Sequence, residues 1–206
     1  MIVVIDYNMG NLCSVEKALL KINAEYKISN KKEDIEAATH IILPGVGFFK
    51  EGMKNLNELN LIDILKQEGI VKKKPLLGIC LGMQLLFKAS EEGGNVKGLG
   101  FIDGDVKKFR FKDNKLKIPH VGWNEIFGKD MANIRIMENI KEHSNFYFVH
   151  SYHAVLNEKI NCCYTDYGYD FVSFVNKDNI YGAQFHPEKS QKKGLELLKN
   201  FVELKV

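Results

Sequence analysis

A cysteine between two glycines stands near the middle of this 206-residue sequence. Gly78-Ile79-Cys80-Leu81-Gly82 has the G-x-C-x-G form of a nucleophile elbow, which is a sharp turn between a strand and a helix. Glycines leave room for the strained backbone of such a turn, and N–H groups at the start of the helix can stabilise an oxyanion. The pattern predicts a nucleophilic Cys80. The alternative interpretation is a small buried cysteine in a glycine-rich turn.

A cysteine nucleophile needs a base, and His186 is the best candidate among the six histidines. It follows the strand-like segment 182–185 and precedes Pro187, which stops a strand because proline fixes φ and lacks an N–H. Glu188 is two residues further on, so in an extended segment its carboxylate lies on the side of the imidazole and can orient it. A solvated turn is the alternative for these residues taken alone.

A second glycine-rich turn, Pro44-Gly45-Val46-Gly47, follows the apolar segment 40–43. Its glycines let backbone N–H groups approach a ligand closely, so Val46 or Gly47 is the natural second donor to an oxyanion. A purely structural turn is the alternative. The sequence has no G-x-x-x-x-G-K-[ST] motif, so we do not predict a phosphate-binding loop.

The elements that must position these residues alternate between strand and helix in the first half of the chain. This alternation predicts an α/β fold, with a parallel sheet covered by helices on both faces. Strands are predicted at 2–5, 26–28, 40–43 and 75–79, and helices at 12–22, 31–38, 48–56, 61–67 (ended by Gly69) and from Leu81 onward.

The second half has a different sequence pattern, with short strands separated by turns. This pattern predicts antiparallel or mixed strand pairing. A glycine-rich loop is expected at 91–100, and an amphipathic helix at 194–204 closes the chain. No linker or internal repeat divides the sequence, so we expect one domain over 1–206. The predicted strands are 104–111, 117–120, 146–149, 154–156, 162–164, 171–175 and 180–185.

Composition excludes several classes of protein. The net charge is +3 with scattered lysines, and the short run 72–74 indicates a solvated turn rather than a nucleic-acid site. The apolar start is too short for a signal peptide and is interrupted by Asp6, and no segment is long enough to span a membrane. Four cysteines without a C-x-x-C pair predict a cytoplasmic protein with no metal site.

Cys80 in GICLGMQLLF, His186 and Glu188 in QFHPEKS, and the PGVG turn together resemble class I glutamine amidotransferases. The segments DYNMGNLCSVEKAL, IPHVGWNEI and FYFVHSYHA narrow the resemblance to the glutaminase subunits of imidazole glycerol phosphate synthase, over nearly the whole chain. The resemblance implies a flavodoxin-like fold: a central, mostly parallel sheet flanked by helices, with added antiparallel strands in the C-terminal half.

This resemblance also implies a reaction. Glutamine would be hydrolysed through a thioester on Cys80, with His186 as acid and base and Glu188 orienting it. The N–H of Leu81 and an N–H of the Val46-Gly47 turn would hold the oxyanion. Glu91 could replace Glu92 as a substrate ligand, because the sequence leaves open which of the two carboxylates faces inward. The implied substrate-binding residues are Gly45, Gln84, Glu92, Ser151 and Tyr152.

The implied partner is a cyclase subunit with a (βα)8-barrel fold, which forms a heterodimer with the glutaminase and receives its ammonia. The products would be imidazole glycerol phosphate and the aminoimidazole ribotide used in purine synthesis. By residue match, Asn11, Tyr147 and Lys189 are interface positions, although Lys189 could equally be a solvated charge. No metal or organic cofactor is implied.

One departure from the family pattern is Asn8, where glycine is usual. Asparagine tolerates a left-handed backbone, so the turn can survive. The departure keeps open a paralogue that supplies ammonia for aminating a surface-polysaccharide sugar. Two other classes remain as alternatives, a stand-alone hydrolase or peptidase of similar fold and a catalytically silent regulatory subunit. Complete Cys80, His186 and Glu188 argue against the silent subunit.

Overall fold

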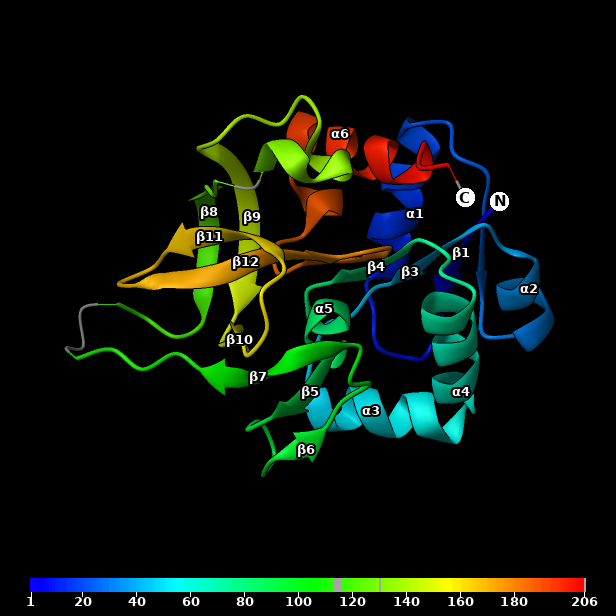
Figure 1. Ribbon diagram of the computed structural model, residues 1–206, viewed down its shortest axis with the longest axis horizontal. Helices are drawn as coiled ribbons and strands as arrows, with labels where there is room; N and C mark the ends of the chain where they lie inside the picture. Colours follow the sequence, from blue (N-terminus) through cyan, green and yellow to red (C-terminus); the bar gives the residue numbers. More distant parts are fainter. Residues whose placement is uncertain (113–115, 130, 206) are drawn as a thin grey trace.

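The computed structural model describes residues 1–112, 116–129 and 131–205. A mixed sheet runs through the molecule in the order β2-β1-β3-β4-β13-β12-β10-β7-β5-β6, and β11 pairs with β12 (Figure 1). Its first five strands are parallel, which confirms the predicted parallel half. They are β2 (Tyr26–Ser29), β1 (Ile2–Ile5), β3 (His40–Leu43), β4 (Leu76–Ile79) and β13 (Ile180–Ala183).

Helices cover both faces of this parallel half, as the alternating pattern predicts. Figure 1 shows α1 (Leu12–Lys21) and α6 (Gln191–Val202) on one face, with the other helices on the opposite face or at the edge. Alternate strand residues feed the two faces, so Val4 packs in the cluster under α1 and Val3 in the cluster on the other side. The remaining α-helices are α2 (Lys32–Ala37), α3 (Phe49–Glu58), α4 (Leu61–Lys66) and α5 (Leu81–Leu85).

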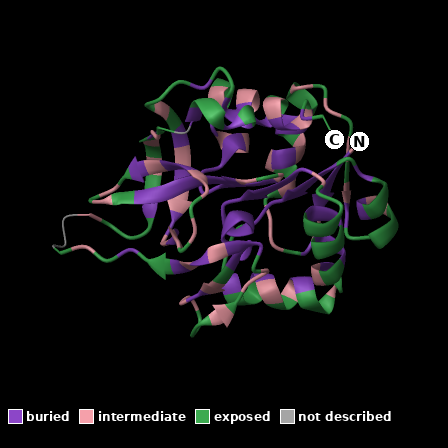
Figure 2. Ribbon diagram, in the orientation of Figure 1, coloured by how far each residue is buried: buried purple, intermediate pink, exposed green. Residues whose placement is uncertain are grey.

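Burial explains why the parallel strands read as continuous apolar runs. All residues of β1, β3, β4 and β13 are buried, and Figure 2 shows them in purple beneath the green outer faces of the helices. A parallel sheet covered on both faces needs apolar side chains at every position rather than at alternate positions. No helix within the described residues is long and apolar enough to cross a membrane.

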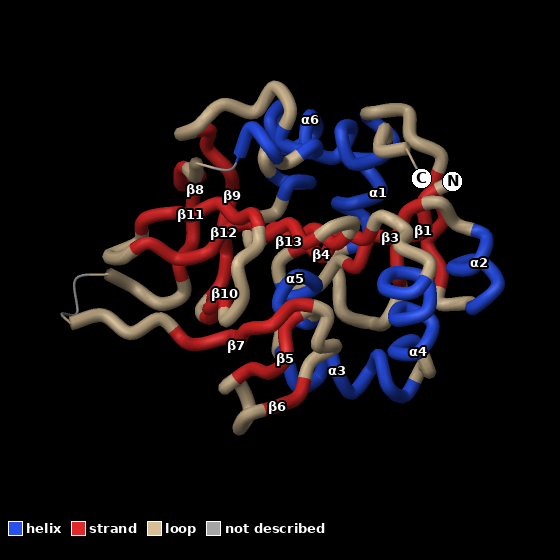
Figure 3. The backbone as a smooth tube through the Cα atoms, in the orientation of Figure 1, coloured by secondary structure: helices blue, strands red, loops and turns tan. Residues whose placement is uncertain are grey.

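The rest of the chain adds mainly antiparallel strands, as predicted. They extend the central sheet, apart from a separate two-stranded ribbon of β8 and β9 that stands beside the end of the sheet (Figure 3). The strands are β5 (Phe87–Ser90), β6 (Val96–Lys97), β7 (Ile102–Lys108), β8 (His120–Ile126), β9 (Ser144–His150), β10 (Tyr152–Leu156), β11 (Asn161–Asp166) and β12 (Asp170–Lys177).

Several predicted boundaries are wrong for identifiable reasons. The strand predicted at 117–120 begins only at His120, because Pro119 has no N–H to pair with a neighbouring strand. The helix after Cys80 ends at Leu85 and a strand follows at once, where buried Phe87 pairs with β7. The loop predicted at 91–100 contains β6, which pairs with β5.

Gly69 does not end the helix that precedes the elbow strand. The chain continues past it as one π-helical turn, Gln67–Val71. Glu68 in this turn is fully buried and pairs with Lys72 at 2.7 Å and Lys74 at 2.6 Å, which holds the turn against the start of β4. A buried carboxylate needs such partners, so the two ion pairs explain why the helix widens instead of stopping.

Candidate active site

The elbow predicted around Cys80 is present. Cys80 follows β4 and precedes α5, and its backbone has φ +52° and ψ −108°, a conformation that a residue with a side chain rarely adopts. A Cβ at Gly82 would lie 1.8 Å from the Leu43 carbonyl oxygen, and one at Gly78 would lie 2.7 Å from the Met83 backbone. Both glycines are therefore sterically required, and Cys80 is buried at the turn they allow.

His186 and Glu188 form a buried pair close to this cysteine. The Nδ1 atom of His186 lies 2.7 Å from Oε1 of Glu188, and both side chains are nearly inaccessible to solvent. Burial lowers the pKa of His186, but the charges and hydrogen bonds of Cys80 and Glu188 outweigh it and raise that pKa to about 10. The buried Nε2 atom makes no hydrogen bond of ordinary geometry among the described residues, so it is free to serve a substrate beside Cys80.

The backbone of His186 is fixed by β9. Its N–H donates to the Tyr147 carbonyl at 2.9 Å, and its own carbonyl accepts from the Ser190 hydroxyl at 2.6 Å. Ser190 in turn accepts from the Tyr147 N–H at 3.0 Å. Sequence reasoning missed this role of Ser190, because a hydroxyl in a short polar turn carries no distinctive pattern.

A cavity of about 300 Å³ brings together most of the predicted site residues. Gly45, His186 and Glu188 are not among its lining residues. A larger cavity of about 810 Å³ lies along residues 128–142, but no cysteine or histidine lines it. Two further cavities, of about 740 and 600 Å³, are also larger, and the first has Cys162 in its lining. The site is therefore identified by the Cys80 elbow beside the buried pair of His186 and Glu188, and not by size. The 300 Å³ cavity is lined by Val46, Gly47, Phe48, Cys80, Leu81, Gln84, Glu92, Pro119, Val149, His150, Ser151 and Tyr152.

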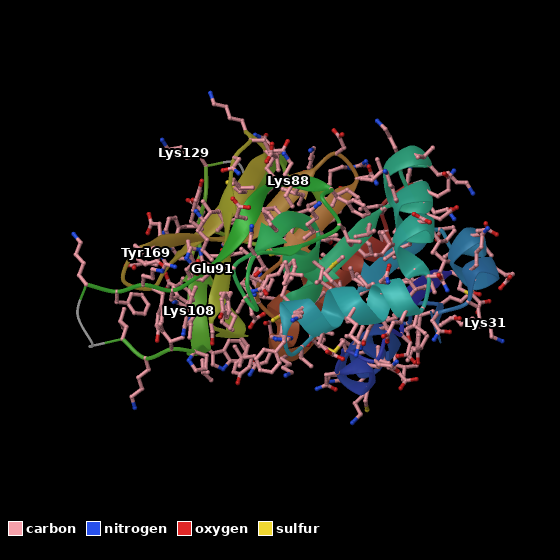
Figure 4. All side chains as sticks on the ribbon, turned by 90° about the horizontal axis from the view of Figure 1, so that it is seen from below. Lys31, Lys88, Glu91, Lys108, Lys129 and Tyr169 are labelled. Atoms are coloured by element: carbon pink, nitrogen blue, oxygen red, sulfur yellow. The ribbon has the colours of Figure 1, made fainter. Side chains whose placement is uncertain are left out.

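Of the two neighbouring carboxylates, Glu92 faces this cavity. Its Oε2 accepts a hydrogen bond from the Phe49 N–H at 2.7 Å, and burial raises its pKa above the usual range of a glutamate. Glu91 points away, where it pairs with Arg110 at 2.9 Å and accepts from the Lys108 N–H. Figure 4 shows Glu91 and Lys108 near each other on the surface. The ambiguity left by the sequence is thus resolved in favour of Glu92.

One of the predicted oxyanion donors is already engaged. The Leu81 N–H donates to the Gly45 carbonyl at 3.3 Å. A Cβ at Gly45 would lie 2.4 Å from the Tyr7 hydroxyl, so this position accepts only glycine. Gly47 has φ +105°, a left-handed conformation that favours glycine, and lies at the mouth of the cavity. Before Leu81 can serve an oxyanion, the Gly45 carbonyl must turn away.

Two buried glutamines connect the cavity to the sulfur. Gln84, a predicted substrate ligand, donates from Nε2 to the Tyr152 carbonyl at 2.9 Å and to Oε1 of Gln184 at 3.0 Å. Gln184 donates from Nε2 to Cys80 Sγ at 3.7 Å. Sequence reasoning missed Gln184, although an amide in the apolar run before His186 is a usable signal.

The three predicted interface residues lie on the surface around the site. Asn11 caps α1 by accepting from the Ser14 N–H at 3.3 Å. The Lys189 ammonium lies 5.9 Å from the centre of the Tyr147 ring, so it is not simply a solvated charge. Sequence reasoning quoted the segment containing Trp123 without assigning it a role. Its ring is about half exposed and packs edge-on against Tyr147 at 6.0 Å.

The predicted departure at Asn8 is tolerated as expected. Asn8 has φ +64°, and its N–H donates to the carboxylate of Asp6 at 3.3 Å. Asparagine adopts this left-handed conformation at less cost than most residues with a side chain, so the turn survives without glycine.

Comparison with known proteins places these features in a class. The family profile for class-I glutamine amidotransferases matches residues 3–204, so the chain belongs to that family. A solved structure titled as a glutamine amidotransferase is 20% identical and superposes with a TM-score of 0.75, covering 98% of this chain and 97% of the other, which supports the fold.

Two curated proteins similar over nearly the whole chain are subunits of imidazole glycerol phosphate synthase. Imidazole glycerol phosphate synthase subunit HisH 1 of Campylobacter jejuni is 49% identical, over 99% of this chain and 100% of the relative. Subunit HisH 2 of Methanococcus maripaludis is 51% identical, over 98% of each. This chain therefore groups with the HisH subunits inside the class-I family.

Proposed function

We propose that this protein is the glutaminase subunit of an imidazole glycerol phosphate synthase, acting in the cytoplasm in histidine biosynthesis. It hydrolyses glutamine to glutamate and passes the ammonia to a cyclase subunit. The observation that carries the proposal is the buried pair of His186 and Glu188 beside the strained Cys80, at the end of a 300 Å³ cavity. Similarity to the HisH subunits supports the choice of synthase.

The first chemical step forms a thioester. The Cys80 proton moves to His186, and the sulfur attacks the side-chain amide carbon of glutamine. The resulting oxyanion is held by the N–H groups of Leu81 and of the turn at Val46 and Gly47. The raised pKa keeps this proton on His186 while the Cys80 thiolate is present. His186 then gives the proton to the departing ammonia, as it must because amide nitrogen is a poor leaving group.

The second step is hydrolysis of the thioester. His186 takes a proton from water, which attacks the same carbon, and the sulfur departs as glutamate forms. Glu188 accepts a hydrogen bond from His186 and stabilises the imidazolium that appears in both steps. The mechanism needs no metal or organic cofactor.

The amino-acid end of glutamine fits the opposite end of the cavity. Both amide protons of Gln84 are used within the protein, so its Oε1 is the atom left to accept from the substrate ammonium. Glu92 adds a carboxylate for the same ammonium, and its partial burial strengthens the attraction. The backbones of Gly45, Ser151 and Tyr152 complete the substrate pocket.

The engaged Leu81 N–H gives this enzyme a resting state. While the Gly45 carbonyl accepts from Leu81, the oxyanion hole is incomplete and turnover is slow. Turning the Gly45–Val46 peptide would free the Leu81 donor, and binding of the partner is the event we expect to drive this change. Ammonia would then be made only where it can be used.

The outer face of the β8–β9 ribbon is the docking surface we propose for the (βα)8-barrel cyclase. Val121 and Trp123 are about half exposed and lie opposite Val149 and Tyr147. Exposed apolar side chains grouped around a site mouth are typical of a protein interface. Lys189 and Asn11 would contribute polar contacts at its rim.

A second candidate is a paralogue with the same triad and a different ammonia acceptor, such as a surface-polysaccharide sugar. Methanococcus maripaludis has two curated HisH relatives of this chain, 51% and 46% identical, so more than one copy occurs in a single organism. Only the partner distinguishes the candidates, because the cavity chemistry is the same in both.

The test measures glutamate release by the purified chain, alone and with the histidine-pathway cyclase and its nucleotide substrate. We expect low activity alone and strong stimulation by the pair. Cys80→Ala should abolish glutamine-dependent synthesis by the complex and leave ammonia-dependent synthesis intact, whereas loss of both in a folded complex would contradict the proposal. Absence of binding to this cyclase, with glutaminase activity preserved, would favour the paralogue.

Trp123→Ala separates docking from chemistry. The side chain is exposed, so the variant should fold normally, while affinity for the cyclase falls by about thirtyfold or more, as for an aromatic hot spot. Leu20→Ala is a matched control, because Leu20 is also exposed but lies on α1, outside the proposed interface. Equal affinities for both variants would remove the β8–β9 ribbon from the docking surface.

A further inference from the structure

Gln184 is a buried polar residue in contact with the sulfur of the cysteine. It follows β13, has no solvent exposure, and its backbone N–H is held by the Ser173 carbonyl at 2.9 Å. Its Nε2 lies 3.7 Å from Cys80 Sγ, within hydrogen-bond range for a sulfur acceptor. Burying an amide is costly unless its polar atoms are used, so its placement against the nucleophile calls for an explanation.

The orientation of this amide is dictated by a chain of hydrogen bonds. A backbone carbonyl can only accept, so the atom of Gln84 that faces the Tyr152 oxygen at 2.9 Å must be its nitrogen. That nitrogen also faces Gln184 at 3.0 Å, which must therefore present its oxygen. The remaining nitrogen of Gln184 is left pointing at the sulfur, so its N–H cannot be exchanged for an acceptor by an amide flip.

The same carbonyl fixes a second branch. Nδ1 of His150 lies 2.8 Å from the Tyr152 oxygen and must carry a proton to donate to it. Nε2 of His150 then accepts from Nδ1 of His120 at 3.1 Å. Burial lowers the pKa of both histidines, which keeps them neutral and preserves this direction. The Tyr152 carbonyl is thus anchored by two donors and holds the glutamine pair rigidly.

The sulfur meets groups suited to its two protonation states. The Val149 carbonyl at 3.8 Å can accept from a thiol S–H but repels a thiolate, whereas the Gln184 N–H attracts a thiolate. The titratable groups facing the sulfur are His186, with Glu188 behind it, and Tyr7, whose hydroxyl donates to the Pro44 carbonyl. Among these neighbours Gln184 is the neutral donor, and it keeps its proton at every stage.

We propose that Gln184 takes part in the glutaminase reaction by donating a hydrogen bond to the Cys80 thiolate, with its orientation set by Gln84 and the Tyr152 carbonyl. When the Cys80 proton passes to His186, the Gln184 N–H stabilises the anion that remains on sulfur. When the C–S bond forms this stabilisation is lost, and it returns when the thioester breaks and the thiolate leaves. The proposal rests on the nucleophilic role of Cys80 proposed above.

The test is the pH profile of Cys80 alkylation by iodoacetamide, followed by mass spectrometry in a Cys13→Ser background that removes the exposed thiol. Gln184→Met keeps the size of the side chain and removes the donor. We expect alkylation at neutral pH to slow about tenfold and the profile to move to higher pH, as for loss of one hydrogen bond to a charged group. Glutaminase kcat with the cyclase should fall similarly.

Controls make the result specific to the donor. Thr165→Val removes another fully buried polar group, away from the cavity, and should leave the profile unchanged. Gln184→Glu is nearly isosteric and places an acceptor against the sulfur, so it should slow alkylation further. If Gln184→Met does not fold, the alkylation profile of Gln184→Glu is the test of the role of Gln184. If neither variant folds, the test is the profile of Gln84→Met, which removes the side chain that orients the Gln184 amide.

A profile for the folded decisive variant that matches the parent chain would overturn the role of Gln184. Such a result would leave the proposed function standing as long as the parent chain hydrolyses glutamine with its partner. If the parent chain itself releases no glutamate with any cyclase, the proposed function fails instead. The two failures are therefore distinguishable.

Discussion

Replacing Glu188 by glutamine tests the pair with His186 most directly. Glu188→Gln preserves shape and removes the negative charge that lies 2.7 Å from Nδ1 of His186. Because both side chains are almost completely buried, little water screens the interaction. A hydrogen bond to a charged group is worth about 1.5–3 kcal/mol, so we expect kcat for glutamine to fall by about 10- to 150-fold.

The substitution should act on turnover rather than on binding. Glu188 lies behind His186, outside the described lining of the glutamine cavity, so KM should stay within about twofold. Removing the carboxylate also removes one cause of the raised pKa of His186, which should fall from about 10. The imidazolium is then lost at a lower pH and stabilises less Cys80 thiolate near neutrality, so the rise of Cys80 alkylation by iodoacetamide should move to higher pH.

The assay is steady-state glutamate release by the complex with the cyclase, at several glutamine concentrations and pH values. Glu188→Asp is the control for charge, because it retains the carboxylate but shortens the reach to His186, and it should retain more activity than Glu188→Gln. A kcat within twofold of the parent, or a raised KM with unchanged kcat, would refute the orienting role of Glu188.

Three further predictions concern stability, measured as the free energy of unfolding in urea. Gly82→Ala should cost more than about 3 kcal/mol, because its Cβ would lie 1.8 Å from the Leu43 carbonyl oxygen. Lys74→Met should cost about 3 kcal/mol, because fully buried Glu68 then loses one of its two cationic partners. Burial lowers the pKa of His120 from 6.5 to about 4. The contribution of neutral His120 to the free energy of unfolding is therefore fully present above pH 6.5 and is lost as the pH falls toward 4. His120→Phe should weaken this acid dependence.

Matched controls accompany these three measurements. Gly10→Ala should change stability little, since the nearest atom to its Cβ would lie 3.4 Å away. Lys54→Met removes an exposed lysine paired at 3.6 Å and should cost less than about 0.5 kcal/mol. Thr165→Val changes a fully buried group that does not titrate and should leave the acid dependence unchanged. If a control variant changes the free energy of unfolding, or its acid dependence, as much as its test variant does, the corresponding explanation is contradicted.

The parallel half of the fold and the placement of the candidate catalytic residues could be predicted because local patterns determine them. Four-residue apolar runs such as Ile2–Ile5 have one stable use, burial on both faces of a parallel sheet. The spacing of the glycines around Cys80 follows from contacts within the same turn. His186 and Glu188 are two residues apart, so their pairing is local too, although it forms in the 3-10 turn Pro187–Lys189 and not in the predicted extended segment.

Other features depend on contacts between distant segments and leave weaker patterns. Phe87–Ser90 becomes a strand only because β7 lies beside it, although its position after a helix suggested more helix. The choice between Glu91 and Glu92 depends on Phe49 and Arg110, which come from other elements. Gln184 contacts the Cys80 sulfur directly and is oriented by Gln84, which is 100 residues away in the sequence. These relationships exist only after the chain has folded.

Strand β9 links the turnover rate of the enzyme to its affinity for the partner. Its Tyr147 carbonyl holds the backbone of His186, its Val149 carbonyl touches Cys80, and its outer face belongs to the proposed docking surface. The same strand therefore carries backbone carbonyls that hold the site and side chains that would contact the partner. A substitution on β9 that raises the affinity for a new partner will also displace these carbonyls and change the turnover rate. A duplicated copy therefore cannot change its partner without a change in rate.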